Sequence, residues 1–148
     1  MQAEPLKTTL RLTPFEFPRS RLRVCVALAA TIALGLATRV DALPWPEFVA
    51  ANFGDALWTV AAYLGLCLVF PQLNPAKVAI LAACISIVVE FSQMSTLPWL
   101  TSLRETLPGR LLLGTGFLWI DIPRYLSGAF IAFLIECYWQ PLTAEPDA

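Results

Sequence analysis

The sequence contains no histidine, and charged residues make up only 14% of it. Histidine is the commonest general base and the commonest metal ligand in proteins, so two large classes of catalytic site lack their usual residue. No G-x-S-x-G segment is present, and this excludes the nucleophile elbow of serine hydrolases. These absences make an enzyme the less favoured class, and we expect no cofactor and no metal.

The cysteines show no pairing pattern. Cys25, Cys67, Cys84 and Cys137 each lie inside an apolar run, and none belongs to a C-x-x-C pair. A free cysteine packs as a small apolar residue, so we predict neither disulfides nor metal ligands.

Apolar residues dominate the chain instead. They make up 57% of the 148 residues, and the mean hydropathy is +0.66. Ordinary soluble domains are less apolar and more charged. The net charge of −1 argues against nucleic acid as a partner, because nucleic-acid binding requires a concentrated basic face. The composition favours a single small unit embedded in a lipid bilayer.

Four apolar segments are candidates for membrane spans. We predict an all-α, polytopic membrane bundle of four transmembrane helices, with a short interfacial or re-entrant segment before the last one. The first segment is short, and a cleaved signal peptide is an alternative interpretation of it. The predicted spans cover residues 24–38, 56–76, 78–97 and 122–138, and the short segment covers residues 111–119.

This pattern divides the chain into a basic cytoplasmic tail (1–23), a four-helix transmembrane domain (24–139) and a C-terminal tail (140–148). With the N-terminus inside, six basic residues lie on the cytoplasmic side and four lie outside. This excess places both termini in the cytoplasm, by the positive-inside rule. Asp55 and Asp121 are expected at helix starts, as N-terminal caps.

Glu90 is the most informative residue. Ser86, Glu90 and Gln93 share one helical face, and a carboxylate at this depth is costly unless it faces protein or water. On the predicted topology, polar groups from all four helices approach the outer face, whereas Glu136 near the inner interface is expected to be solvated. The predicted ligand site or buried polar network comprises Arg39, Asp55, Trp58, Glu90, Gln93, Arg104, Arg110, Trp119, Asp121 and Tyr125.

Several motifs resemble a small bacterial integral-membrane family, domain of unknown function 2809. The resemblance covers about residues 21 to 138, with Gly128 near its end. It rests on Gly35-Leu-Ala-Thr-Arg39, Gly54-Asp55-Ala-Leu-Trp58, Val89-Glu90-Phe-Ser-Gln93, and the segment from Gly109-Arg110 through Gly114-Thr-Gly116 to Asp121 and Tyr125.

That family is distantly similar to the VanZ-like membrane proteins, which are linked to teicoplanin resistance. These proteins carry a Glu-x-x-Gln pair on one helix and an Arg and an Asp before the last helix. Glu90, Gln93, Arg110 and Asp121 stand at the matching places. The VanZ-like pattern also has an Asn soon after the Asp, where this chain has Arg124 and Tyr125.

Three interpretations of the polar cluster remain open: an ion-pair network that fixes helix register, a ligand site, and a proton or ion path. The function we favour is an accessory protein of the bacterial cytoplasmic membrane that presents an outward-facing Arg–carboxylate site to an amphiphile or envelope-related ligand. A small proton- or ion-coupled transporter is one alternative. Another is a structural subunit, as a homo-oligomer or within a membrane complex.

Overall fold

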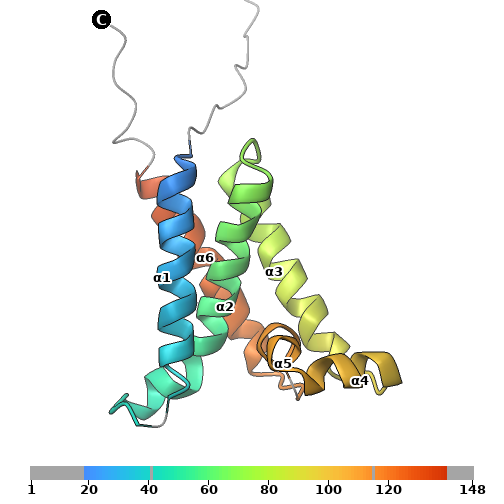
Figure 1. Cartoon of the computed structure of the whole chain (residues 1–148). Helices are drawn as coiled ribbons and strands as arrows, with labels where there is room; N and C mark the ends of the chain where they lie inside the picture. Colours follow the sequence, from blue (N-terminus) through green and yellow to red (C-terminus); the bar gives the residue numbers. More distant parts are fainter. Residues whose placement is uncertain (1–18, 41, 115, 140–148) are drawn as a thin grey trace, which may run out of the picture.

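The protein is described by a computed structural model that covers residues 19–40, 42–114 and 116–139. Within these ranges the chain is all-helical, as predicted, and forms no strand. The described residues form six helices (Figure 1): α1 (Arg21–Ala37), α2 (Glu47–Val69), α3 (Pro75–Ser92), α4 (Pro98–Glu105), α5 (Leu107–Leu113) and α6 (Asp121–Trp139).

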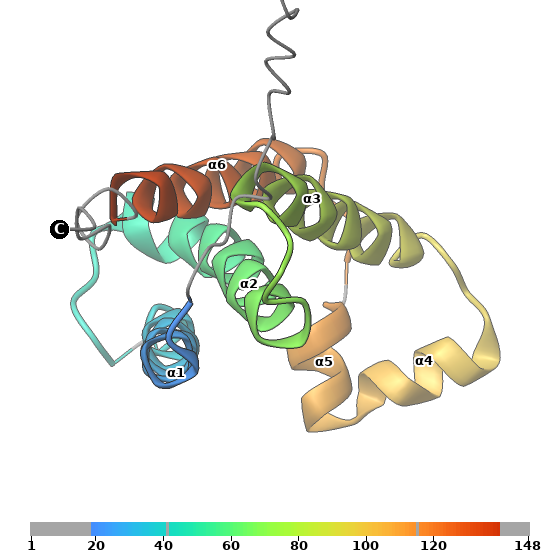
Figure 2. The ribbon, with the colours of Figure 1, turned by 90° about the horizontal axis from the view of Figure 1, so that it is seen from above.

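Helix α2 lies at the centre of the bundle. It packs against α1, α3 and α6, and α3 also packs against α6. Seen from above, α1 lies beside α2 and apart from the rest, while α4 and α5 extend to the other side (Figure 2). The start of α1 and the end of α6 lie at the same end of the bundle (Figure 1). We call this the terminal end, and the opposite end the hairpin end, because α4 and α5 lie there.

The close contact between α2 and α6 depends on Gly128, which has no side chain. A Cβ atom at Gly128 would lie 2.2 Å from the backbone oxygen of Ala56. Ala129 and Ala132 on α6 are also buried, so the two helices approach closely along a row of small residues. The sequence predicts this face correctly from the spacing of Gly128 and Ala132.

Local sequence explains where the shorter helices begin. Asn74 accepts a hydrogen bond from the Lys77 amide at 2.8 Å, and Pro75 occupies the first turn of α3, where a missing N–H is harmless. Thr106 caps α5 in the same way, by accepting from the Gly109 amide at 3.1 Å. At the sharp bend between α4 and α5, a Cβ atom at Gly109 would lie 1.7 Å from the oxygen of Leu103. Only glycine fits this bend without a shift of the backbone.

One of the two predicted helix starts needs correction, and the other is confirmed. Helix α2 begins at Glu47 and not near Asp55, so Asp55 lies inside the helix and is no cap. Asp121 is the first residue of α6, and its carboxylate accepts from the Arg124 side chain three residues later. The expected connection between the third and last spans also contains two short helices, α4 and α5.

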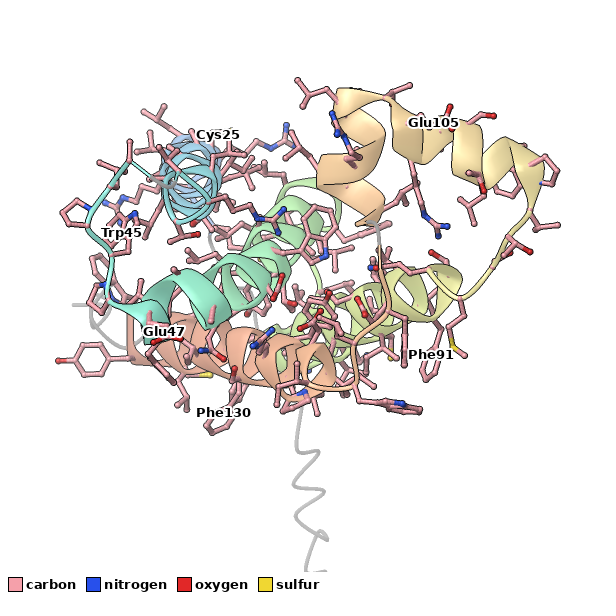
Figure 3. The ribbon with its side chains drawn as sticks, turned by 90° about the horizontal axis from the view of Figure 1, so that it is seen from below. Cys25, Trp45, Glu47, Phe91, Glu105 and Phe130 are labelled. Carbon is pink, nitrogen blue, oxygen red and sulfur yellow. The ribbon has the colours of Figure 1, made fainter. Side chains whose placement is uncertain are left out.

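The outer surface of the bundle is apolar. Val88 on α3 is 67% exposed and Phe130 on α6 is 58% exposed, and Figure 3 shows Phe91 and Phe130 pointing away from the bundle. A large apolar surface of this kind marks a membrane or interaction face. Among the described helices, α2 and α3 are long and apolar enough to cross a bilayer. Helix α1 has only 17 residues, and α6 carries the charged residues Asp121, Arg124 and Glu136.

Candidate functional site

Glu90 lies inside the bundle with 0% of its surface exposed. One carboxylate oxygen accepts from the Leu118 amide at 2.7 Å. The other accepts from Gln93 Nε2 at 2.8 Å and from the hydroxyl of Tyr125 at 2.7 Å. Helices α3 and α6 and the segment before α6 therefore meet at one side chain. Because both oxygens have donors, the carboxylate can be buried without an unsatisfied group.

Gln93 extends this cluster to the segment between α5 and α6. Its Oε1 atom accepts from the Gly116 amide at 2.8 Å. Gly114 lies against the same side chain with φ 65° and ψ −178°, a conformation that is essentially restricted to glycine. A Cβ atom there would lie 2.5 Å from Gln93 Nε2. The Glu90 cluster, which we define as Glu90, Gln93 and Tyr125, thus fixes the path of the chain into α6.

A chain of ion pairs lies beside this cluster and links α6 to α2 and to the end of α1. Arg124 Nη1 lies 2.5 Å from Asp121 Oδ1 and 3.3 Å from Asp55 Oδ2. Arg39 Nη2 lies 3.5 Å from the other oxygen of Asp55, and the Arg39 side chain is 49% exposed. Asn52 accepts from Arg124 Nε at 2.9 Å. The short Arg124 contacts position Asp121, whereas the long, exposed Arg39 contact contributes little to stability.

Arg110 on α5 differs from the other arginines of this end. Within the described part of the chain, its side chain makes no hydrogen bond and no ion pair. It lines a polar cavity of about 430 Å³ with residues from α2, α3, α5 and α6. The polar members of this lining are Arg39, Asp55, Gln93, Arg110, Asp121 and Tyr125.

An apolar cavity of about 480 Å³ adjoins the polar one. It lies between α1, α2 and α5, and its walls include Leu28, Ile32 and Leu57. The two cavities share four lining residues, so the polar and apolar spaces are neighbours with a common wall. The shared residues are Arg39, Trp58, Leu111 and Leu112.

A family model described as "Protein of unknown function (DUF2809)" matches residues 45–129, which is more than half of the chain. The chain belongs to this family. The sequence-based identification is therefore confirmed, although the match is shorter than the predicted residues 21 to 138 and omits the Arg39 motif. The relationship of this DUF2809 protein to VanZ-like proteins stays a prediction. No solved structure matches the chain.

Eight of the ten predicted site residues lie at the polar cavity or in the Glu90 cluster behind it. Arg104 and Trp119 do not. Arg104 donates to the Ser92 oxygen at 2.6 Å and to the Ser95 oxygen at 3.2 Å, so it caps the end of α3. Trp119 is 69% exposed and packs edge-on against Phe91 and Phe117 on the outside of this DUF2809 protein.

The expectation that Glu136 is solvated was wrong. Glu136 accepts from Arg19 Nε at 2.7 Å and from the hydroxyl of Tyr63, and the Arg19 side chain is only 7% exposed. Arg19 also donates to the oxygens of Pro71 and Leu73. Burial lowers the pKa of Arg19, but the hydrogen bond and charge of Glu136 outweigh it, so the pKa is raised. The terminal end of this DUF2809 protein thus has its own polar cluster, which we call the Arg19–Glu136 clamp.

Sequence reasoning also missed two contacts, and helical spacing could have indicated the first of them. Arg124 was treated as a departure from the VanZ-like pattern, yet it lies three residues after Asp121 and therefore on the same face. Thr59 on α2 and Ser86 on α3 are both fully buried, and their hydroxyls lie 2.9 Å apart. Within the described ranges, no three His, Cys, Asp or Glu residues are placed to hold a metal ion.

Proposed function

We propose that this DUF2809 protein is a four-span protein of the bacterial cytoplasmic membrane that binds an amphiphile at an outward-facing Arg–carboxylate site. A lipid headgroup or a lipid-linked envelope precursor has the required combination of a polar end and an apolar chain. The common wall of the two cavities carries the proposal. A polar space lined by Arg39, Asp55, Arg110 and Asp121 lies next to an apolar space of similar size, with Trp58 on the shared wall.

The arrangement suits an amphiphile for a physical reason. Each cavity falls within the range of about 300–1,000 Å³ that is typical of small-molecule sites. A water-soluble ligand would leave the apolar cavity without favourable contacts, and a hydrocarbon would leave Arg110 without a partner among the described residues. A molecule with both parts satisfies both cavities.

The test compares two glycine substitutions in the purified full-length protein. Gly35 lines the apolar cavity, and an added Cβ would make only an ordinary contact of 3.6 Å with Leu57. Gly35→Leu should therefore fill the cavity without unfolding the helix. Gly65→Leu is the matched control, because a Cβ there has no atom within 4 Å and Gly65 does not line the cavity.

We expect one class of amphiphile to be enriched among the lipids that co-purify with the wild-type protein, relative to its fraction of the membrane lipids. Mass spectrometry measures both fractions. Gly35→Leu should lose this enrichment and Gly65→Leu should keep it. If all three proteins carry lipid in bulk proportions, the proposal is wrong.

The topology has its own test. Cys25 on α1 and Cys84 on α3 are exposed on the helix surfaces, and Cys67 is buried. In a bilayer, exposed thiols on spans face lipid, so a membrane-impermeant maleimide should label none of them in intact cells. After solubilisation in denaturant, all should react. Labelling of Cys25 or Cys84 in intact cells would contradict the four-span arrangement.

A proton-coupled carrier is a second candidate, because polar groups continue into the terminal half of the bundle. The buried Thr59–Ser86 pair lies one helical turn from Glu90 on α3 and one turn from Tyr63 on α2. Tyr63 in turn contacts Glu136. When an inward proton gradient is imposed on vesicles that contain the purified protein, the vesicle interior should then acidify. Glu90→Gln should stop this proton flux. Equal flux in protein-free vesicles would exclude this candidate.

A further inference from the structure

We propose that the amphiphile is an anionic glycerophospholipid of the surrounding bilayer, with its phosphate at Arg110, one acyl chain in the apolar cavity and the second chain outside. This inference rests on the proposed function and names the ligand class of that same site. It combines three observations: the charge at Arg110, the shape of the apolar cavity and the packing of the helices that border it.

The free guanidinium of Arg110, and not the net charge of the polar cavity, favours an anion, because two arginines and two aspartates line the cavity. Asp55 and Asp121 are both paired with Arg124, and Asp55 also contacts Arg39. Arg110 lines the same cavity and has no partner among the described residues. A guanidinium group binds phosphate through two parallel N–H···O bonds. An uncharged glycerol headgroup has no pair of anionic oxygens to accept these bonds. One unmatched guanidinium therefore fits one singly charged phosphodiester.

Arg39 is placed to hold the junction between headgroup and chain. It lines both cavities, its side chain is half exposed, and its contact to Asp55 is long, at 3.5 Å. A long and exposed ion pair is weak, so the guanidinium can turn towards a phosphate. Trp58 lies on the same shared wall, and its ring offers an apolar face at the level where the glycerol would lie.

The apolar cavity accepts a chain because small residues line its floor. Gly35 on α1 and Ala61 and Ala62 on α2 leave room between the larger residues of α1 and α5. Leu28, Ile32 and Leu112 supply apolar walls. A flexible acyl chain fits such a lining. Because the chain comes from the bilayer, its burial is held by packing alone, and the preference for one lipid rests on the headgroup contacts.

The second chain can remain outside the cavity, because α1 and α5 do not pack against each other and leave one side of the cavity open. Helices α1 and α5 border the cavity, yet α1 packs only against α2, and α5 packs only against α3 and α4. In Figure 2, α1 and α5 lie on opposite sides of α2. A lipid can therefore enter from the bilayer between α1 and α5 with one chain, and need not leave the membrane.

Binding of three defined lipids to the purified full-length protein tests the proposal. The probes are dioleoyl phosphatidylglycerol, its single-chain lyso form, and dioleoylglycerol, which has the same chains and no phosphate. Native mass spectrometry in detergent measures the bound fraction. We expect phosphatidylglycerol to bind at least about ten times more tightly than dioleoylglycerol. Hydrogen bonds to charged groups are stronger than those between neutral groups.

Arg110→Gln should remove this preference, and Arg110→Lys should restore part of it, since the charge returns without the bidentate geometry. Lys77→Gln is the control for loss of one positive charge, because Lys77 lies at the start of α3 and lines neither cavity. Arg110 is exposed and without partners among the described residues, so Arg110→Gln should fold normally.

The outcomes separate the two proposals. If no probe binds saturably to the wild-type protein, the glycerophospholipid is wrong, whereas the proposed function fails only if no amphiphile co-purifies above its share of the membrane lipids. If dioleoylglycerol binds as tightly as phosphatidylglycerol, or if Arg110→Gln keeps the preference, the amphiphile site stands and the anionic headgroup is wrong. If the lyso form binds and the two-chain lipid does not, the opening between α1 and α5 is wrong.

Discussion

Glu90 and Arg110 are two charged residues at the hairpin end of the molecule, and their surroundings are opposite. Glu90 has no exposed surface, and three donors satisfy its two oxygens. Arg110 faces the polar cavity and has no partner among the described residues. A buried charge with all of its partners in the protein is part of the architecture. An accessible charge without partners is available to a ligand.

The sharpest test of this difference replaces each residue by leucine. Glu90→Leu leaves the Tyr125 hydroxyl, the Gln93 amide and the Leu118 N–H without their acceptor, so it should lower the free energy of unfolding by about 3–5 kcal/mol. Arg110→Leu should change it by less than about 0.5 kcal/mol, because Arg110 is exposed and its side chain has no hydrogen bond or ion pair among the described residues. Reversible unfolding in detergent micelles measures both values. Equal losses for the two variants would remove the distinction.

The Arg19–Glu136 clamp extends the comparison to the terminal end. Arg19→Leu removes a 2.7 Å ion pair and the hydrogen bonds to the oxygens of Pro71 and Leu73. We expect a loss of about 2–3 kcal/mol in the free energy of unfolding, typical of hydrogen bonds to a charged group.

Lipid binding by Arg19→Leu should stay at the wild-type level, because the clamp does not line either cavity. Arg21→Leu is the control, since Arg21 is exposed at the start of α1. A binding defect in Arg19→Leu at a temperature where the protein is folded would show that the two ends are coupled.

Periodicity predicted the parts of this arrangement that lie on single helices. Ser86, Glu90 and Gln93 share a face of the same element, and all three point into the bundle or the polar cavity as expected. Gly128 was likewise identified from its spacing to Ala132, and it lies where α6 crosses α2. Helical spacing is a property of neighbouring residues, so one sequence is sufficient to find it.

Contacts between distant segments could not be predicted in this way. Arg19 and Glu136 are 117 residues apart, and nothing near either residue indicates the other. The early start of α2 was missed because Asp55 matched the pattern of an N-terminal cap. In the folded chain Asp55 lies inside the helix and its carboxylate contacts Arg39 and Arg124. Tertiary partners, which are absent from local sequence, decide these cases.

Gly114 tests whether the Glu90 cluster determines the path of the chain into α6. Gly114→Ala places a side chain where φ is +65° and where a Cβ meets Gln93 Nε2 at 2.5 Å. We expect a loss of about 1–3 kcal/mol in the free energy of unfolding, from the disfavoured backbone conformation. Gly116→Ala is the matched control, because among the described residues other than its chain neighbours no atom lies within 4 Å of the added Cβ, and it should be close to neutral. Equal behaviour of the two variants would contradict a fixed conformation at Gly114.

The smallest expected effect concerns Arg39, whose environment lies between those of Glu90 and Arg110. A Cβ at Gly54 would lie 3.3 Å from Arg39 Nε, so Gly54→Ala must displace the guanidinium slightly. Alanine favours the helix over glycine by up to about 1 kcal/mol, and the protein should therefore be as stable as the wild type or more stable.

Affinity for phosphatidylglycerol should fall by about twofold in the same variant, because a small displacement weakens one charged contact by a fraction of a kcal/mol. Stability and affinity would then change in opposite directions at one residue. This is expected where a side chain serves the ligand and not the fold. Lipid titration and thermal unfolding of the same preparation measure both quantities, and a parallel loss of the two would assign Arg39 to the architecture together with Glu90.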